Sequence, residues 1–240
     1  MLERILTICV VIYLYLHVVY HLKTSNDLVI YDLDHVTRTS IDEMVKLRQP
    51  FTFRPDLGFN DFYQHKQYKV RTPALTLLSE AKPPFYSERN DLFLKEIAAA
   101  PQYEACDYVF RPPMCVSKEY DVVLGDEATG PFQYSIAYRT FLYCSAGSAV
   151  VKLAPPETSG RLNVQKDYLN MTYTADPGDV RTLETTLNEG DALFLPAYWW
   201  YSLTLKKASV CVFRYKTAMS VVATSPEYAL HYLQCGNVKL

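Results

Sequence analysis

The distribution of apolar residues divides the chain into an unbroken N-terminal segment, a mixed region and a long series of short β-like runs. The unbroken segment, Ile5 to Leu22, contains no Lys, Arg, Asp or Glu. At about 1.5 Å per residue, a helix of this length covers about 27 Å, which is close to the hydrocarbon thickness of a bilayer. We therefore predict a transmembrane helix over about residues 5–22, within an N-terminal anchor formed by residues 1–24.

A cleaved signal peptide is the alternative interpretation of this segment. The apolar stretch is long for a signal peptide, and the sequence "VVYHLKTSN" that ends it lacks a small-residue cleavage site. Tyr20 is typical of an interfacial aromatic, and His17 and His21 are expected at the level of the lipid headgroups. Arg4 and Lys23 flank the segment, so the charge pattern favours neither topology. We expect a single-pass membrane protein.

The mixed region contains two candidate helices and one candidate strand. "NDLVIYDLDHV" predicts a strand, and "TSIDEMVKLRQP" predicts a short helix with Ser40 as its N-cap and Glu43 three residues later. "SERNDLFLKEIAAAPQ" predicts a second helix that ends before Pro101. Residues 51–70 carry aromatic side chains without a clear period.

From about residue 105 the pattern is typical of β-structure. Short apolar runs such as "YDVVLG", "SAVVKLA" and "ASVCVFRYKTA" are separated by turn sequences such as "SAGS", "NEGD" and "KKA". Many short strands at this spacing indicate an antiparallel sandwich or barrel. Residues 226–234 predict a last helix. We expect one mainly β domain over residues 25–240, with its barrel core at about 105–222.

Composition excludes some classes of partner. The 24 basic and 26 acidic side chains give a net charge of −2, which argues against a nucleic-acid partner and leaves the membrane and an unidentified protein as expected partners. The six cysteines form no C-x-x-C pair. Cys106 and Cys115 would pair only in an oxidising compartment, so free thiols are the default expectation.

Two motifs give the chain a resemblance to a known family. They are "YRTFLYCSAGSAVVKLAPPE", residues 138–157, and "LNEGDALFLPAYWWYSL", residues 187–203. Together they resemble the cupin-like JmjC family, which includes protein hydroxylases. The resemblance covers about residues 28–222 and implies a double-stranded β-helix, also called a jelly roll, with flanking helices. Membrane-anchored cupin-like proteins are also familiar from large DNA viruses, so the resemblance implies a viral structural or membrane protein as one specific possibility.

The resemblance also locates the catalytic positions. The enzymes hold Fe(II) with an H-x-D or H-x-E element and a second His after paired tryptophans. Those positions fall at Gln133 or Tyr134, at Ser135 or Ile136, and at Tyr201. None of these residues is a His, Asp or Glu.

The cosubstrate position departs from the family pattern as well. The lysine that pairs with 2-oxoglutarate in the family falls at Ser148 or Ala149, and Lys152 comes two or three residues too late. We therefore expect no catalytic residue, no metal site and no cofactor.

What remains is a vestigial pocket formed by Gln133, Tyr134, Ser135, Trp199 and Tyr201. Gln133 and Tyr201 are expected to fill a dry barrel and to form hydrogen bonds inside it. Motifs of other enzyme classes, including the P-loop, G-x-S-x-G and H-E-x-x-H, are absent from the sequence.

The expected function is therefore that of a membrane-anchored, non-catalytic cupin-like domain acting as a structural or protein-interaction module. One alternative is an active Fe(II)/2-oxoglutarate-dependent hydroxylase with atypical ligands. Another is a small-ligand or glycan-binding module, which requires an open, aromatic-lined pocket. Asn170 begins the glycosylation sequon "NMT", which matters only if the domain faces a lumen.

Overall fold

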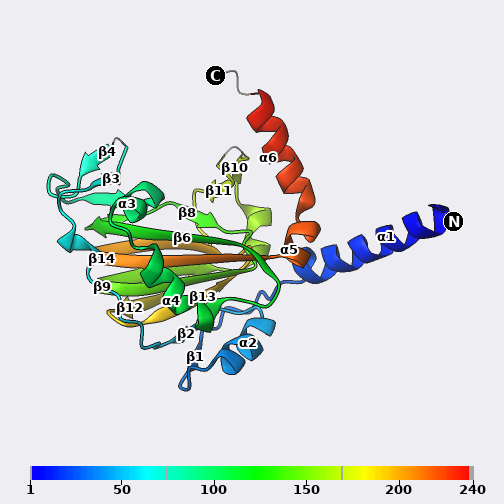
Figure 1. The fold of residues 1–240 in the computed structure, drawn as a ribbon, viewed down its shortest axis with the longest axis horizontal. Helices are drawn as coiled ribbons and strands as arrows, with labels where there is room; N and C mark the ends of the chain where they lie inside the picture. Colours follow the sequence, from blue (N-terminus) through cyan, green and yellow to red (C-terminus); the bar gives the residue numbers. More distant parts are fainter. Residues whose placement is uncertain (1, 74, 169, 238–240) are drawn as a thin grey trace.

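The computed structural model describes residues 2–73, 75–168 and 170–237. A mainly β body carries two helices that project away from it, α1 (Leu2–His17) at the N-terminus and α6 (Ser225–Asn237) near the C-terminus (Figure 1). A single π-helical turn, η1 (Val18–Leu22), continues α1 to the body. No side chain of α1 is buried. The predicted mainly β architecture with flanking helices is confirmed.

Within the described residues, twelve strands form one large sheet and two more form a separate hairpin. The strands of the hairpin are β3 (Lys69–Arg71) and β4 (Leu75–Leu77). The strands of the large sheet are β1 (Tyr31–Leu33), β2 (Phe51–Phe53), β5 (Phe85–Ser87), β6 (Cys115–Asp126), β7 (Ala128–Thr129), β8 (Phe132–Tyr134), β9 (Arg139–Ala154), β10 (Gln165–Asp167), β11 (Thr172–Ala175), β12 (Leu183–Asn188), β13 (Ala192–Pro196) and β14 (Trp200–Thr217).

Two long strands, β9 and β14, form the centre of the sheet. They pair antiparallel from Arg139 opposite Tyr215 to Ala154 opposite Trp200. β13 and β12 follow each other along the other edge of β9, while β6 and β8 pair with opposite ends of β14. The sheet therefore curves around a barrel interior instead of lying flat.

The predicted turns at "SAGS" and "KKA" are wrong, because β9 and β14 run through both sequences. The chain bends there instead. Gly147 has φ +76°, and the β14 register shifts between Lys206 and Ser209. A Cβ atom on Gly147 would lie 2.1 Å from the carbonyl oxygen of Lys207, so the bend requires both the left-handed conformation and the missing side chain.

The predicted hairpin at "NEGD" is confirmed. The Asp191 N–H donates to the Asn188 carbonyl oxygen at 2.9 Å, and Asp191 Oδ2 accepts from the Asn188 N–H at 2.9 Å. Gly190 supplies the positive φ of +90° that this turn needs. The turn directs β13 back along β9 toward the paired tryptophans.

The helices begin at different residues from those predicted. The N-cap of α2 (Arg38–Lys46) is Thr37, whose hydroxyl accepts the Ser40 N–H, so Ser40 is the third residue of a capping box and not the N-cap. Pro101 lies in the first turn of α4 (Ala100–Phe110), where a missing N–H costs no helical hydrogen bond. The remaining helices are η2 (Phe62–Gln64), α3 (Asp91–Glu96), η3 (Pro156–Arg161) and α5 (Ala218–Ala223).

Opposite faces of the sheet support two different cores. An aromatic core lies between the sheet and helices α2 and α4, and Phe213 and Tyr215 of β14 contribute to it. An aliphatic core fills the barrel interior, where the alternate residues Val210 and Val212 point. All six cysteines are free thiols, so Cys106 and Cys115 are not paired.

Candidate functional site

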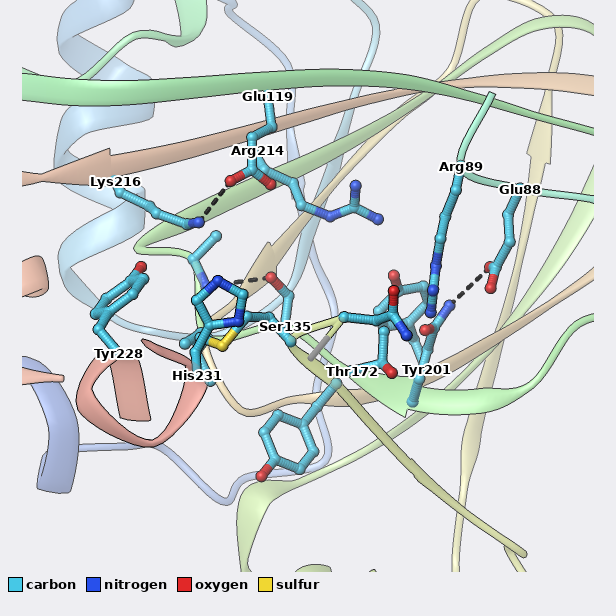
Figure 2. Close-up of a pocket in the computed structure, with 16 residues that line it drawn as sticks. Glu88, Arg89, Glu119, Ser135, Thr172, Tyr201, Arg214, Lys216, Tyr228 and His231 are labelled. Carbon is cyan, nitrogen blue, oxygen red and sulfur yellow. Dashed lines mark hydrogen bonds and ion pairs between the residues drawn. The ribbon is translucent and has the colours of Figure 1, made fainter. Parts of the chain in front are cut away.

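A cavity of about 430 Å³ lies at the mouth of the barrel. Its walls come from β6, β8, β11 and β14, from the segment between β5 and α3, and from α6 (Figure 2). Because these elements are far apart in the sequence, the cavity exists only in the folded chain. At this size it is within the range of small-molecule pockets.

The register of β8 on β14 shows which residue of β8 shares a face of the sheet with Tyr201. Gln133 lies directly opposite Tyr201, so the two side chains share a face of the sheet. Tyr134 instead stacks on Tyr173 at 4.7 Å and meets Trp200 edge-on at 4.8 Å between ring centroids. The alignment that places the first histidine at Gln133 also places the carboxylate at Ser135, and it stays a prediction. Gln133, Ser135 and Tyr201 all line the cavity.

The structure brings together four of the five residues expected in the vestigial pocket. Gln133, Tyr134, Ser135 and Tyr201 line the cavity, whereas Trp199 does not. Trp199 is 1% exposed and packs in the aliphatic core of the barrel. The residues at the mouth form the wall of an open cavity and do not fill it.

Sequence reasoning missed the charged residues of the cavity. Arg214 and Lys216 come from β14, on the face that carries Val210 and Val212 deeper in the barrel. Glu88 and Arg89 come from the segment after β5. The available signal was the change from apolar to cationic residues along one face of β14, because alternate residues of a strand share a face and Arg214 and Lys216 continue the row of Val210 and Val212.

The acidic side chains of the cavity have partners. Glu119 forms an ion pair with Lys216. Glu88 Oε2 accepts hydrogen bonds from Gln133 Nε2 at 3.0 Å and from the Tyr86 hydroxyl at 3.2 Å. Both carboxylates are therefore held at the wall.

The two arginines of the cavity are not neutralised in this way. Within residues 2–73, 75–168 and 170–237, no carboxylate oxygen lies within 4 Å of a side-chain nitrogen of Arg89 or Arg214. Both residues line the cavity, Arg89 from the segment after β5 and Arg214 from β14 (Figure 2). The backbone of Arg89 is fixed because its N–H donates to Asp121 Oδ2 at 2.9 Å.

The surroundings keep Arg214 charged and Tyr201 neutral. Burial alone would lower the pKa of Arg214, but Tyr201, Asp121 and Glu119 outweigh burial and raise that pKa. Burial raises the pKa of Tyr201, although Arg214 opposes the shift. The cavity therefore presents a permanent cation beside an un-ionised phenol.

The residues present do not fit Fe(II) and 2-oxoglutarate. In the part of the chain that the structure describes, no three His, Cys, Asp or Glu residues are grouped to hold a metal ion. Gln133, Ser135 and a neutral Tyr201 are poor substitutes for imidazole and carboxylate ligands. Ala149 is fully buried in the aliphatic core, and Lys152 pairs with Glu184 at 3.1 Å on the outside of the barrel.

Asn170 lies exposed in the turn between β10 and β11, at the rim of the cavity. Its Nδ2 donates to Asp167 Oδ2 at 2.6 Å. Its glycosylation stays a prediction.

The end of the N-terminal helix is attached to the domain beside this cavity. Leu2–Leu22 is long and apolar enough to span a membrane. Arg48 donates hydrogen bonds to the carbonyl oxygens of Val19 at 2.6 Å and Lys23 at 2.7 Å. The His21 ring nitrogen Nδ1 lies 2.5 Å from the Tyr198 hydroxyl, in the loop that leads into β14.

Comparison with known proteins agrees with the fold. A protein-family model for the cupin-like domain matches residues 57–217, which is more than half of the chain. The chain therefore belongs to the family of cupin-like domains. A search of curated proteins found no match.

Proposed function

We propose that this chain is a membrane-anchored, non-catalytic cupin-like protein that binds a small anionic ligand at the mouth of its barrel. The observation that carries the proposal is that two guanidinium groups, those of Arg89 and Arg214, line one cavity. Neither forms an ion pair with a carboxylate in the part of the chain that the structure describes. Guanidinium groups bind carboxylates and phosphates through paired hydrogen bonds. An anion in the cavity would meet cationic groups from two different walls.

Membrane anchorage is supported by contacts at the end of the apolar helix. A cleaved signal peptide leaves the mature protein, whereas here Arg48 donates to the backbone of Val19 and His21 contacts Tyr198. His17 Nδ1 also lies 2.9 Å from the Ala223 carbonyl oxygen. These contacts favour a retained anchor.

The non-catalytic assignment is supported by the residue types at the mouth. An oxygenase with atypical ligands would have to recruit Glu88, Glu119 or His231, the carboxylates and histidine that line the cavity. Glu119 pairs with Lys216, and His231 Nδ1 lies 2.6 Å from the Tyr168 carbonyl oxygen. These interactions compete with metal ligation.

The ligand-binding role is favoured over a filled barrel because the mouth is open and aromatic. Tyr134, Tyr201 and Tyr228 all line the cavity, so a ligand would meet phenol rings as well as guanidinium groups. The structural or protein-interaction role and the viral origin expected from the sequence are compatible with this proposal, and they stay predictions.

The test uses the full chain in detergent micelles with inorganic phosphate as the probe. At about 100 times its dissociation constant, a ligand stabilises a protein by about 2.7 kcal/mol, which raises the thermal unfolding midpoint by several degrees. We expect Arg214→Gln to lose this stabilisation and Arg214→Lys to keep part of it. Arg181→Gln, which changes an exposed arginine, is the matched control.

Two results contradict the proposal. One is equal stabilisation by phosphate in the wild type and in Arg214→Gln; the other is no stabilisation by either phosphate or succinate. Anaerobic calorimetry with Fe(II) alone tests the non-catalytic assignment separately, and binding at micromolar strength would restore the hydroxylase alternative.

A further inference from the structure

The C-terminal helix α6 leaves the domain next to the end of the N-terminal helix, at the same position along the axis of that helix. α5, which directly precedes α6, packs along α1 and η1. The Tyr20 hydroxyl donates to Met219 Sδ at 3.0 Å, and His17 Nδ1 lies 2.9 Å from the Ala223 carbonyl oxygen. In a spanning helix that ends at Leu22, these residues lie at the level of the lipid headgroups. α6 therefore begins at that level too.

The direction of α6 keeps the whole helix at that same depth relative to the bilayer. In Figure 1, α6 runs crosswise to α1, and both helices extend away from the sheet. A bilayer crossed by α1 lies across the axis of that helix. A helix crosswise to α1 then runs along the bilayer surface.

The two sides of α6 differ in their contacts. On the side facing the domain, the Glu227 carboxylate accepts a hydrogen bond from the Tyr173 hydroxyl at 3.1 Å, and Tyr228 and His231 line the cavity. The other side carries residues spaced at i, i+3, i+4 and i+7, namely Pro226, Ala229, Leu230 and Leu233. All four are exposed, with Leu230 at 43% and Leu233 at 59%.

The outer side of α6 has no charge to oppose entry into lipid. Its four residues are apolar, the residues Ser225–Asn237 include no Lys or Arg, and the one acidic residue, Glu227, faces the domain. An apolar face of this kind is stable when it is buried at the boundary of headgroups and acyl chains. Because α6 directly follows α5, which packs against α1 and η1, a bilayer that α1 spans also reaches this face.

We propose that α6 lies on the membrane surface, with Leu230 and Leu233 inserted into the interfacial region of the bilayer that α1 spans. The partner is the lipid surface itself. This inference rests on the proposed membrane anchorage. It also makes α6, which carries Tyr228 and His231 on its inner side, a wall between the cavity and the lipid.

The experiment places a polarity-sensitive fluorophore at single cysteines in the full chain, reconstituted in nanodiscs. The main variant combines Leu233→Cys with Cys9→Ser and Cys235→Ser, which removes the two exposed native thiols. Ser79→Cys in the same background is the control, because Ser79 is exposed beside the β3–β4 hairpin, at the end of the domain opposite α1. A third sample labels native Cys9, within the span, in a Cys235→Ser chain.

We expect the label at position 233 to emit at shorter wavelength than the label at position 79. We also expect several-fold quenching of the position-233 label by lipids that carry a nitroxide near the top of the acyl chain. The label at Cys9 should be quenched by nitroxides deeper in the chain. This pattern supports both the anchor and the surface helix.

The other outcomes are distinguishable. If position 233 behaves like position 79 while Cys9 is quenched, the anchor stands and the surface-helix proposal is overturned. If Cys9 is not quenched either, the membrane anchorage itself is wrong. If position 233 is shielded from water but not quenched by lipid, a second copy or another protein covers α6, and the proposal is again overturned.

Discussion

Gln133 and Tyr201 face each other directly across the pairing of β8 with β14, and each side chain is more than nine-tenths buried. This pairing fixes the register of the barrel mouth. It favours the alignment in which Gln133 and Ser135 take the positions of the H-x-D element and Tyr201 that of the second histidine, and this alignment stays a prediction.

The register predicts which substitutions create a metal site. Gln133→His, Ser135→Asp and Tyr201→His together place two imidazoles and one carboxylate on one face of the mouth, which is the ligand set that suits Fe(II). We expect the triple variant to bind Co(II), used as a spectroscopic probe, at micromolar strength, whereas the wild type does not. Visible absorption during titration measures this binding.

The matched control moves two of the substitutions by one residue, to Tyr134→His and Ile136→Asp, and keeps Tyr201→His. Tyr134 stacks on Tyr173, so a histidine there points away from Tyr201. Equal Co(II) binding by both variants would show that the register is wrong.

The bend shared by β9 and β14 predicts a cost for a single methyl group. In Gly147→Ala, the new Cβ meets the Lys207 carbonyl oxygen at 2.1 Å at a φ of +76°. We expect the free energy of unfolding in denaturant to fall by about 2 kcal/mol or more. Gly160→Ala, where the space around the new Cβ is open, should change it by less than about 0.5 kcal/mol. Similar losses at both positions would contradict this account of the bend.

The hydrogen bonds from Arg48 predict a local change in mobility. Arg48→Gln removes the charged group that donates hydrogen bonds to the carbonyl oxygens of Val19 and Lys23. A hydrogen bond from a charged group contributes about 1.5 kcal/mol or more to stability. Amide exchange in residues 18–27 should therefore become roughly ten times faster, with no change in the barrel strands. Mass spectrometry of the exchanged peptides measures this. Arg38→Gln, an exposed change in α2, should leave exchange unaltered.

Two buried thiols predict a loss of stability in alkali. Burial raises the pKa of Cys144 and of Cys211 from about 9 to about 12, so the folded state favours the protonated thiol. The contribution of these protonated thiols to the free energy of unfolding is fully present below pH 9 and is lost as the pH rises toward 12. Each thiol should contribute a loss on the order of 1 kcal/mol by pH 10.

Denaturant unfolding at pH 8 and pH 10 measures that loss. Replacing both cysteines with alanine should reduce the pH dependence without abolishing it, because burial also raises the pKa of Tyr143 to about 12. An unchanged pH dependence in the double variant would show that the thiols are not responsible.

The sequence was informative where short-range chemistry decides structure. Gly190 and Asp191 sit in a turn whose partners are two or three residues away, so the hairpin was predictable from the letters alone. Gly147 also lies in a turn-like sequence, but it sits at a bend within β9 instead of in a hairpin turn. It accommodates Lys207, sixty residues later in the chain, and no local pattern distinguishes a bend of two strands from a hairpin.

The cavity was less predictable than the fold for the same reason. The motifs pointed to Tyr201 and to a window that includes Gln133 and Ser135, but Arg89 enters from a segment outside both motifs. Arg214 lies in a strand that sequence reasoning treated as apolar. The contacts of Tyr228 and His231 depend on where α6 packs, which the helical pattern of the tail does not specify.

The attachment of Arg48 to the end of the N-terminal helix has a consequence for encounters with other molecules. A domain on a flexible tether tumbles and presents every side in turn. In the proposed membrane-anchored state, a domain fixed to its helix keeps only translation in the plane of the bilayer and rotation about the bilayer normal. Partners in the same membrane then meet it at one height and one tilt, so the orientational search that slows association is shortened before any contact forms.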